Sequence, residues 1–273
     1  MPLSLDTEEL IYMNKLREAF TKNKKTVIGF MTAGDPTFEA SVQNVLALAE
    51  GGADIIEIGI PFSDPIAEGP IIQQANIRAL SNGMTTDRAF ELVKRVREKI
   101  DTPICLITYL NPVFKYGYDR FFEDCAKCGV DGIFVPDMPY EERPEAADFA
   151  KKHGITIIPL VAPAAPARIK AIAESAHGEG YVYVASALSD AGLTEDGKSE
   201  LKAVIDEAKK YTDLPMAVWF GIHTPKEAKR VAEIADGVIV ESAAVELVTK
   251  HGQKAAPYIA EFIEQMRTAL DNM

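Results

Sequence analysis

Short runs of apolar and β-branched residues alternate with longer amphipathic segments from residue 27 to the end of the chain. This alternation is typical of repeated strand–helix units. Several runs follow the same kind of glycine-containing turn, as at Gly51 to Asp54 and Cys128 to Asp131, where glycine ends the preceding helix. Eight consecutive units without a topological break favour a closed (β/α)₈ barrel over an open doubly wound sheet. The expected strands are 27–31, 54–60, 104–109, 132–135, 156–161, 181–185, 216–220 and 237–240.

The length of the chain suits one barrel domain that covers residues 1–273. A chain of 273 residues, 47% of them hydrophobic, can bury a substantial core, and barrels of this length routinely form a single domain. Residues 6–20, ahead of the first strand, are expected to form a helix that covers the floor of the barrel. The prediction is therefore an α/β chain, one (β/α)₈ TIM barrel with an extra N-terminal helix.

The charge balance narrows the class of partner. A net charge of −12 argues against nucleic acid and anionic membranes, because phosphate groups would repel the surface, so a small-molecule substrate is expected. Three cysteines are too few for a disulfide framework, and the first ten residues lack the basic-then-apolar order of a signal peptide. No apolar run approaches the roughly 18 residues of a membrane span. These features predict a protein of the reducing cytoplasm.

Glu57 is the most informative single residue, because it places a carboxylate inside an apolar strand. Both faces of a parallel barrel strand are dry, so an ionised Glu57 needs a partner and otherwise its pKa rises. A raised pKa suits a general acid or base near neutral pH. The alternative is a structural ion pair with a neighbouring loop. Asp64 and Glu68 lie on the loop that follows this strand, where barrels build their active sites.

Other catalytic chemistries have little support in the sequence. Cys125 and Cys128 have redox-like spacing, but they fall at the end of a helix, where a buried face is the simpler interpretation. The four histidines are scattered, and no second cysteine pair exists, so a zinc site is not indicated. None of the eight expected strands contains a lysine that could form a Schiff base.

Five segments together resemble the tryptophan synthase alpha chain family: 30–36, 57–73, 108–112, 136–139 and 159–163. The resemblance covers nearly the whole chain, and the motif from Glu57 to Gly69 is highly specific. It implies cleavage of indole-3-glycerol phosphate to indole and glyceraldehyde 3-phosphate, with no metal and no organic cofactor. It also implies an α2β2 complex in which indole passes through a tunnel to a pyridoxal-phosphate beta subunit.

The resemblance assigns roles to residues of this chain. Glu57 matches the acid/base that protonates the indole C3 carbon. Glu68 stands where the family usually has aspartate, the residue that holds the indole N–H and stabilises the positive intermediate. The resemblance further implies an indole cavity lined by Phe30, Tyr109 and Tyr183, and a beta-subunit contact surface that includes Asp64 and Asn111.

The resemblance weakens at the phosphate site. Gly192, Thr194, Gly221 and Ser242 match family positions that bind the substrate there, and the loop 186–198 is a candidate lid. Four neighbours depart from the pattern: Asp190, Glu195, Trp219 and Glu241. Two like charges about 4–6 Å apart in a partly dry pocket repel by on the order of a few kcal/mol, so a glutamate at this helix start would oppose phosphate.

Three hypotheses therefore stay open. In the first, the chain is the family's lyase, with Glu57 as general acid/base and Glu68 as the partner of the indole nitrogen; phosphate still binds there if Glu241 turns outward. In the second, Trp219, His223 and Glu241 form an altered site for a different, unphosphorylated aromatic substrate. In the third, the barrel acts chiefly as an allosteric partner of a beta subunit.

Overall fold

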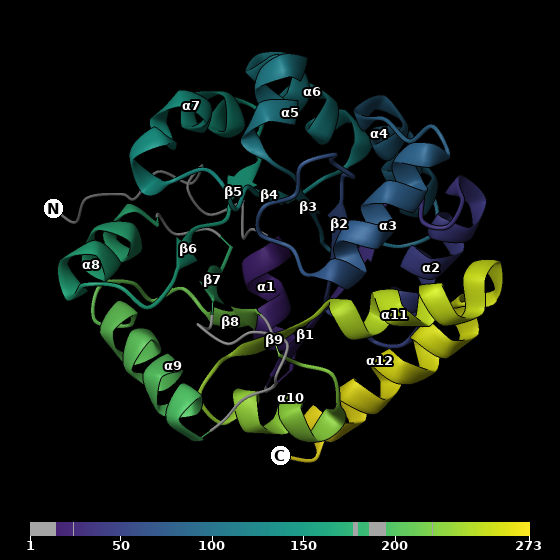
Figure 1. Cartoon of the computed structure of the whole chain (residues 1–273). Helices are drawn as coiled ribbons and strands as arrows, with labels where there is room; N and C mark the ends of the chain where they lie inside the picture. The colour runs from purple at the N-terminus through teal and green to yellow at the C-terminus, as the bar shows by residue number, and fades with distance from the viewer. Residues whose placement is uncertain (1–14, 24, 177–179, 186–194, 220) are drawn as a thin grey trace, which may run out of the picture.

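The computed structural model describes residues 15–23, 25–176, 180–185, 195–219 and 221–273. Parallel strands stand at the centre and helices surround them (Figure 1). The strands are β1 Thr26–Thr32, β2 Ile55–Gly59, β3 Ile104–Ile107, β4 Gly132–Phe134, β5 Thr156–Ile157, β6 Leu160–Val161, β7 Val182–Ala185, β8 Met216–Trp219 and β9 Gly237–Val240. The helices are α1 Lys15–Lys22, α2 Phe38–Glu50, α3 Pro70–Ser81, α4 Thr86–Arg97, α5 Leu110–Tyr116, α6 Tyr118–Cys128, η1 Tyr140–Glu142, α7 Pro144–Lys152, α8 Pro166–Ser175, α9 Glu195–Ala208, α10 Pro225–Ala232, α11 Ser242–His251, η2 Gly252–Lys254 and α12 Ala256–Asp271.

The sheet closes on itself, which confirms the barrel. Its strand order is β5-β4-β3-β2-β1-β9-β8-β7-β6, and every pair is parallel. The two end strands are consecutive in the chain and correspond to the single strand expected at 156–161. Pro159 has no N–H and interrupts the ladder. The ring still closes there, because the Ile158 N–H donates to the Ile133 carbonyl at 2.8 Å and the Tyr183 N–H donates to the Pro159 carbonyl at 2.9 Å.

The recurring turns before the strands tie the floor of the barrel together. In these turns Asp54 accepts the backbone N–H of Val27 at 2.8 Å, and Asp131 accepts that of Ile104 at 2.9 Å. Each aspartate also pairs with a partly buried arginine, Asp54 with Arg267 at 2.8 Å and Asp131 with Arg97 at 2.5 Å. The contacts of these two carboxylates stabilise the amino ends of the strands. Candidate catalytic carboxylates are therefore sought at the carboxyl ends.

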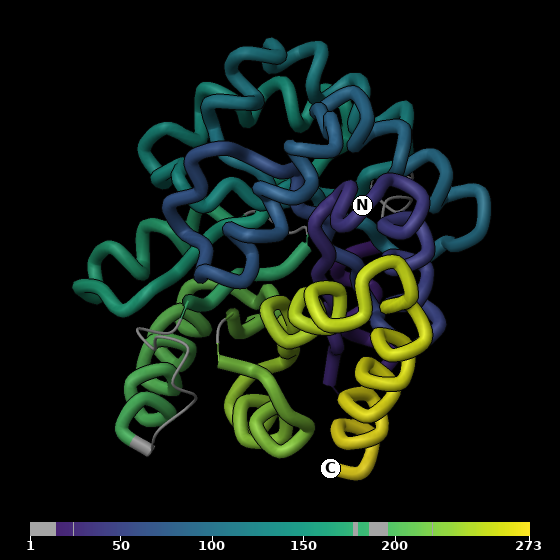
Figure 2. Tube along the Cα trace, turned by 45° about the vertical axis from the view of Figure 1, so that its right-hand side comes forward, coloured from purple at the N-terminus to yellow at the C-terminus, as the bar shows by residue number. Residues whose placement is uncertain are grey.

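Helix α1 lies across the same floor, as expected for an N-terminal helix (Figure 1). Leu16 is fully buried there, and its Cδ1 would stand 2.7 Å from a Cβ built on Gly132. Of the expected range 6–20, residues 6–14 lie outside the described residues. The first and last parts of the chain meet, because β1 pairs with β9 and α12 packs against α2 (Figure 2).

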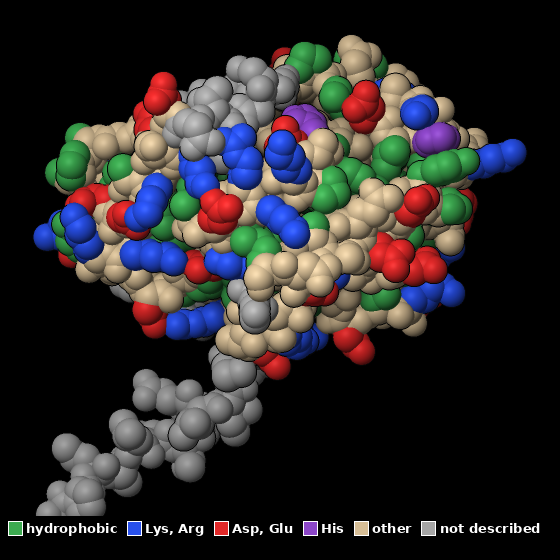
Figure 3. Space-filling model, turned by 90° about the horizontal axis from the view of Figure 1, so that it is seen from below, with side chains coloured by type: hydrophobic (Ala, Val, Ile, Leu, Met, Phe, Trp, Pro, Cys, Tyr) green, Lys and Arg blue, Asp and Glu red, His purple; other side chains and the backbone are tan. Residues whose placement is uncertain are grey.

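The outer surface carries mixed charge. On the face shown in Figure 3, basic and acidic side chains are interspersed and hydrophobic ones are scattered among them. None of the helices in the described ranges has the length and apolar character needed to cross a lipid bilayer.

Candidate active site

Glu57 lies on β2 with its side chain fully buried. Two tyrosine hydroxyls hold the carboxylate. Tyr181, the residue before β7, donates its hydroxyl to Oε1 at 2.6 Å, and Tyr183 on β7 donates to Oε2 at 2.5 Å. None of the ion pairs described in the structure includes Glu57, so the structural ion-pair interpretation finds no support among the described residues. The carboxylate is held by neutral donors, and its charge is not compensated.

This environment brings the proton affinity of Glu57 into the neutral range. Burial raises the pKa of Glu57 to about 7, and the hydrogen bonds from Tyr181 and Tyr183 limit the rise. The same burial, together with the charge of Glu57, raises the pKa of both tyrosines well above the usual value, so the hydroxyls stay protonated donors. Glu57 can therefore both give and take a proton near pH 7.

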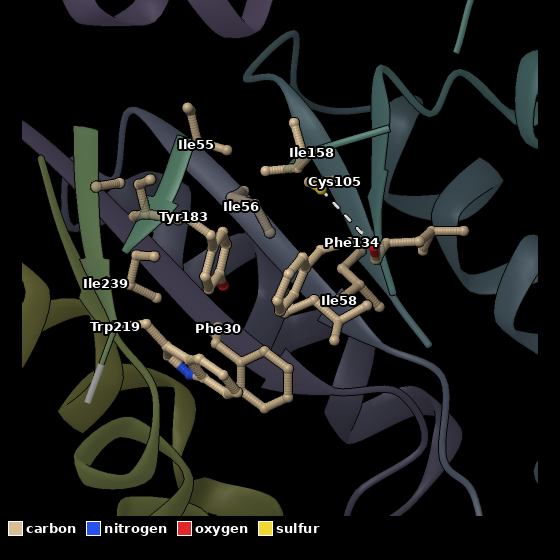
Figure 4. Packing of buried hydrophobic residues seen from close by; sticks show 14 of the residues in the cluster. Phe30, Ile55, Ile56, Ile58, Cys105, Phe134, Ile158, Tyr183, Trp219 and Ile239 are labelled. Carbon is tan, nitrogen blue, oxygen red and sulfur yellow. Dashed lines mark hydrogen bonds between the residues drawn. The ribbon is translucent and has the colours of Figure 1, made fainter. Parts of the chain in front are cut away.

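Aromatic rings from four strands gather inside the barrel (Figure 4). The Tyr183 ring stacks on Phe134 with centroids 4.0 Å apart, and Trp219 meets both rings edge-on at 5.6 and 5.7 Å. Phe30 pairs in register with Glu57 and is 2% exposed. A Cβ on Gly59 would stand 2.7 Å from the Phe30 ring, so glycine there leaves room for it. These rings form an apolar cluster, and Tyr183 joins it to the Glu57 carboxylate.

Glu68 lies on the loop between β2 and α3, the second carboxylate expected from the sequence. Asn76 on α3 donates its amide to Oε2 of Glu68 at 2.5 Å, and the Gln73 side chain donates to the Glu68 carbonyl at 2.8 Å. Burial raises the pKa of Glu68 to about 7, against hydrogen bonds from Asn76 and Tyr109 that lower it. Tyr109 also accepts the backbone N–H of Ala67 at 3.0 Å, which fixes the loop over the barrel.

A third carboxylate, Glu241, belongs to the same neighbourhood. It is 7% exposed at the start of α11 and accepts a hydrogen bond from the indole N–H of Trp219, which is 5% exposed. Burial raises the pKa of Glu241 well above its usual value, and the nearby charges of Glu57 and Glu68 raise it further. The structure therefore places Glu241 inward, and the expectation that its side chain turns outward is wrong.

Of the other residues expected at the phosphate end of the substrate, some are described in the structure and some are not. Gly221, with φ of +77°, and Ser242, the first residue of α11, follow β8 and β9 at the carboxyl ends of the strands. The His223 N–H donates to Glu227 at 2.9 Å, and within the described residues its Nε2 is buried without a partner. No contact between His223 and the Trp219–Glu241 pair is found among the described interactions. Gly192, Thr194 and residues 186–194 of the lid lie outside the described residues, and its last four residues, 195–198, begin α9.

Sequence reasoning missed Tyr181, Phe134 and Asn76. Tyr181 could have been found, because it lies two residues before Tyr183 and side chains two apart point to the same face of a strand. Phe134 ends β4 and stacks on Tyr183 of β7, a contact between strands that are brought together only when the barrel closes. Asn76 reaches back eight residues to Glu68, a contact that depends on how the loop folds.

The cysteines take no part in this site. Cys125 and Cys128 are buried at the end of α6, where burial raises the pKa of both thiols, as the packing interpretation expects. Cys105 pairs in register with Glu57 and is also buried. In the described part of the chain, no group of three or more His, Cys, Asp or Glu side chains has the geometry to hold a metal ion.

Comparison with known proteins places this architecture in a family. The family model of the tryptophan synthase alpha chain matches residues 16–273. The chain belongs to the tryptophan synthase alpha chain family. It is 49% identical to the tryptophan synthase alpha chain of Lacticaseibacillus casei, over 95% of this chain and 96% of that protein. This level of identity over nearly full length confirms the resemblance found in the sequence.

Solved structures agree with this assignment. The crystal structure of tryptophan synthase subunit alpha from Legionella pneumophila superposes with a TM-score of 0.86 at 37% identity, covering 96% of this chain and 100% of that one. A chain from the α2β2 tryptophan synthase complex of Pyrococcus furiosus superposes with a TM-score of 0.82 at 34% identity, covering 90% and 99% of the two chains. The barrel described here is thus the fold of this family.

Proposed function

We propose that this chain is the indole-3-glycerol-phosphate lyase of tryptophan biosynthesis in the cytoplasm, with Glu57 as its acid/base residue. The observation that carries the proposal is the buried carboxyl of Glu57, held by two tyrosine hydroxyls at 2.5 and 2.6 Å, with a pKa of about 7. A carboxylic acid with this pKa can hold a proton for a carbon atom and still release it at neutral pH. The reaction needs such a group.

The reaction can be written with Glu57 as the only proton carrier. Protonated Glu57 gives its proton to C3 of the indole ring, which leaves a positive charge on the ring nitrogen. The carboxylate then takes the proton of the adjacent side-chain hydroxyl, the bond between C3 and that carbon breaks, and its electron pair returns to the ring. Indole and an aldehyde are formed, and Glu57 regains its proton. Tyr181 and Tyr183 hold the carboxylate throughout.

We assign Glu68 to the indole nitrogen. An ionised Glu68 accepts the ring N–H and offsets the positive charge that develops when C3 is protonated. Asn76 positions this carboxylate through its amide at 2.5 Å. Phe30, Tyr109 and Tyr183 form the wall against which the ring lies. The productive state therefore has a proton on Glu57 and none on Glu68.

We also propose a beta subunit as partner. Asp64, on the loop after β2, and Asn111, on α5 after β3, are both exposed. Two apolar side chains close to them in the sequence are also exposed, Ile66 at 79% and Phe114 at 67%. Exposed apolar residues grouped at one end of a barrel are typical of an interaction surface. The relative from Pyrococcus furiosus is part of an α2β2 complex, which supports this partner.

An indole-release assay tests the function. The purified chain should release indole and glyceraldehyde 3-phosphate from indole-3-glycerol phosphate without added metal, and turnover should rise when a tryptophan synthase beta chain is added. No indole from a folded chain with the beta chain present would overturn the lyase function. Faster beta-chain turnover without indole release would favour the third hypothesis, a barrel that acts only as an allosteric partner.

The pH dependence of kcat/KM should be bell-shaped with its maximum near pH 7. The pKa values of Glu57 and Glu68 are both about 7. Below pH 7 Glu68 gains a proton and no longer offsets the ring charge, whereas above pH 7 Glu57 loses the proton it must donate. A plot of kcat/KM from pH 5 to 9 checks this, because it reports the groups of the free enzyme. A flat profile across this range would contradict the assigned protonation states.

A further inference from the structure

The wall formed by β8, β9 and the start of α11 ends in two large side chains. Barrels that take phosphorylated substrates generally hold the phosphate at the loops after their seventh and eighth strands and at a helix N-terminus. β8 and β9 are the seventh and eighth strands here, because β5 and β6 make one interrupted strand. Trp219 ends β8, and Glu241 lies between β9 and α11. These two residues therefore occupy the usual anion position.

The Trp219–Glu241 pair is fixed in place. The indole N–H of Trp219 donates to Oε2 of Glu241, and both side chains are at least nine-tenths buried. On its other side the Trp219 ring meets Tyr183 and Phe134 edge-on, with centroids 5.6 and 5.7 Å away. Moving either member outward would break this hydrogen bond and expose the ring. The pair fills the space as a unit.

Occlusion is a stronger obstacle to phosphate here than charge. Burial raises the pKa of Glu241 well above its usual value, which disfavours the ionised form of its carboxyl. A protonated carboxyl does not repel a phosphate as an ionised one does. The carboxyl belongs to the residue directly before α11, makes no hydrogen bond to the first turn and is held by Trp219, so the buried pair lies at the helix start, where backbone N–H groups would meet a phosphate. A hydroxyl is smaller than a phosphate and can both donate to and accept from a carboxyl group.

We propose that the Trp219–Glu241 pair is a specificity determinant that removes most of the contribution of the phosphate group to substrate binding. The proposal rests on the lyase function above. The substrate class is then an indole with a hydroxylated side chain, and indole-3-glycerol is used about as well as its phosphate ester.

The test compares kcat/KM for indole-3-glycerol phosphate with kcat/KM for indole-3-glycerol. In the native chain the two values should agree within about threefold, and in Glu241→Gly the ratio should shift at least about tenfold toward the phosphate ester, because the helix start is opened. Glu241→Gln fills the same volume and should stay within about threefold of the native ratio. Glu246→Gly, the same change at an exposed position of α11, is the matched control and should leave the ratio unchanged.

Two results would overturn the proposal. One is a native preference of about a hundredfold or more for the phosphate ester. The other is a ratio in Glu241→Gly that equals the native ratio while circular dichroism shows a folded chain. Isothermal titration with inorganic phosphate gives a readout without turnover: Glu241→Gly should bind phosphate more tightly than the native chain, and equal affinity would count against occlusion. Failure of the lyase function is distinct, because a folded native chain would then release indole from neither substrate.

Discussion

Replacing Glu57 by glutamine should lower kcat for indole release about a hundredfold to ten-thousandfold, since general acid–base groups contribute about 10² to 10⁴ in rate. Glutamine has the same size as glutamate, and its amide can still pair with the hydroxyls of Tyr181 and Tyr183. The loss therefore reports the missing proton and not a collapsed site. It is measured as indole formed per active site, with substrate in excess and the beta chain present.

The same Glu57→Gln variant should be more stable than the native chain at alkaline pH. The unfolded side chain loses its proton near pH 4.5, and the folded one near pH 7. The contribution of Glu57 to the stability of the native chain is thus fully present below pH 4.5 and is lost as the pH rises to 7. The loss is about 3 kcal/mol when the pKa difference is converted to free energy. Glutamine has no proton to lose, so it avoids this cost. At pH 8 its free energy of unfolding should exceed the native value by about 1–3 kcal/mol.

Urea unfolding at pH 5 and pH 8 checks the stability change, with Glu50→Gln, an exposed glutamate on α2, as the control. The gain should be larger at pH 8 than at pH 5, and the control should change by less than about 0.5 kcal/mol at either pH. Residual turnover within about tenfold of native would remove Glu57 from the chemistry. If Glu57→Gln gained the same stability over the native chain at both pH values, the carboxyl of Glu57 would not be desolvated.

The barrel was predictable because strand and helix periodicities are local properties of the sequence. Every expected strand overlaps one in the structure, and the glycine that ends α6, Gly129, has the left-handed backbone that the turn pattern predicts. The ends of the elements were less predictable. The expected strand 104–109 stops at Ile107, because Tyr109 already caps α5. Pro159 divides another expected strand, and its missing N–H was visible in the sequence.

Only those site residues could be predicted that lie at the ends of strands or match the family's motifs. Glu57 and Glu68 follow from their positions at the carboxyl end of β2. The bond between Trp219 and Glu241 does not, since it joins residues from different units and depends on two side-chain rotamers. The sequence alone predicts an anionic Glu241, whereas burial raises its pKa and disfavours the ionised form. The pKa of a side chain depends on the closed barrel, which no local pattern describes.

Replacing Glu68 by glutamine should lower kcat by about a hundredfold, because the neutral amide no longer offsets the charge on the indole ring. The Asn76 side chain can still donate to the glutamine oxygen, so the loop should keep its position. The acid side of the pH profile should disappear as well, since the group whose protonation causes it is gone. Rates with saturating substrate check the loss of kcat, and kcat/KM between pH 5 and 7 checks the loss of the acid side.

Two further variants separate the charge of Glu68 from its place on the loop. Glu68→Asp keeps the charge and moves it by one methylene, so it should retain activity within about tenfold of native, whereas Glu68→Gln should not. Asp64→Asn removes a charge from an exposed position of the same loop, where the side chain contacts only Ser63 in the described hydrogen bonds. Assayed without the beta chain, it should stay within about twofold of native. If Asp64→Asn cost as much as Glu68→Gln, the carboxylates of this loop would act through the general field, and Glu68 would have no specific partner on the indole ring.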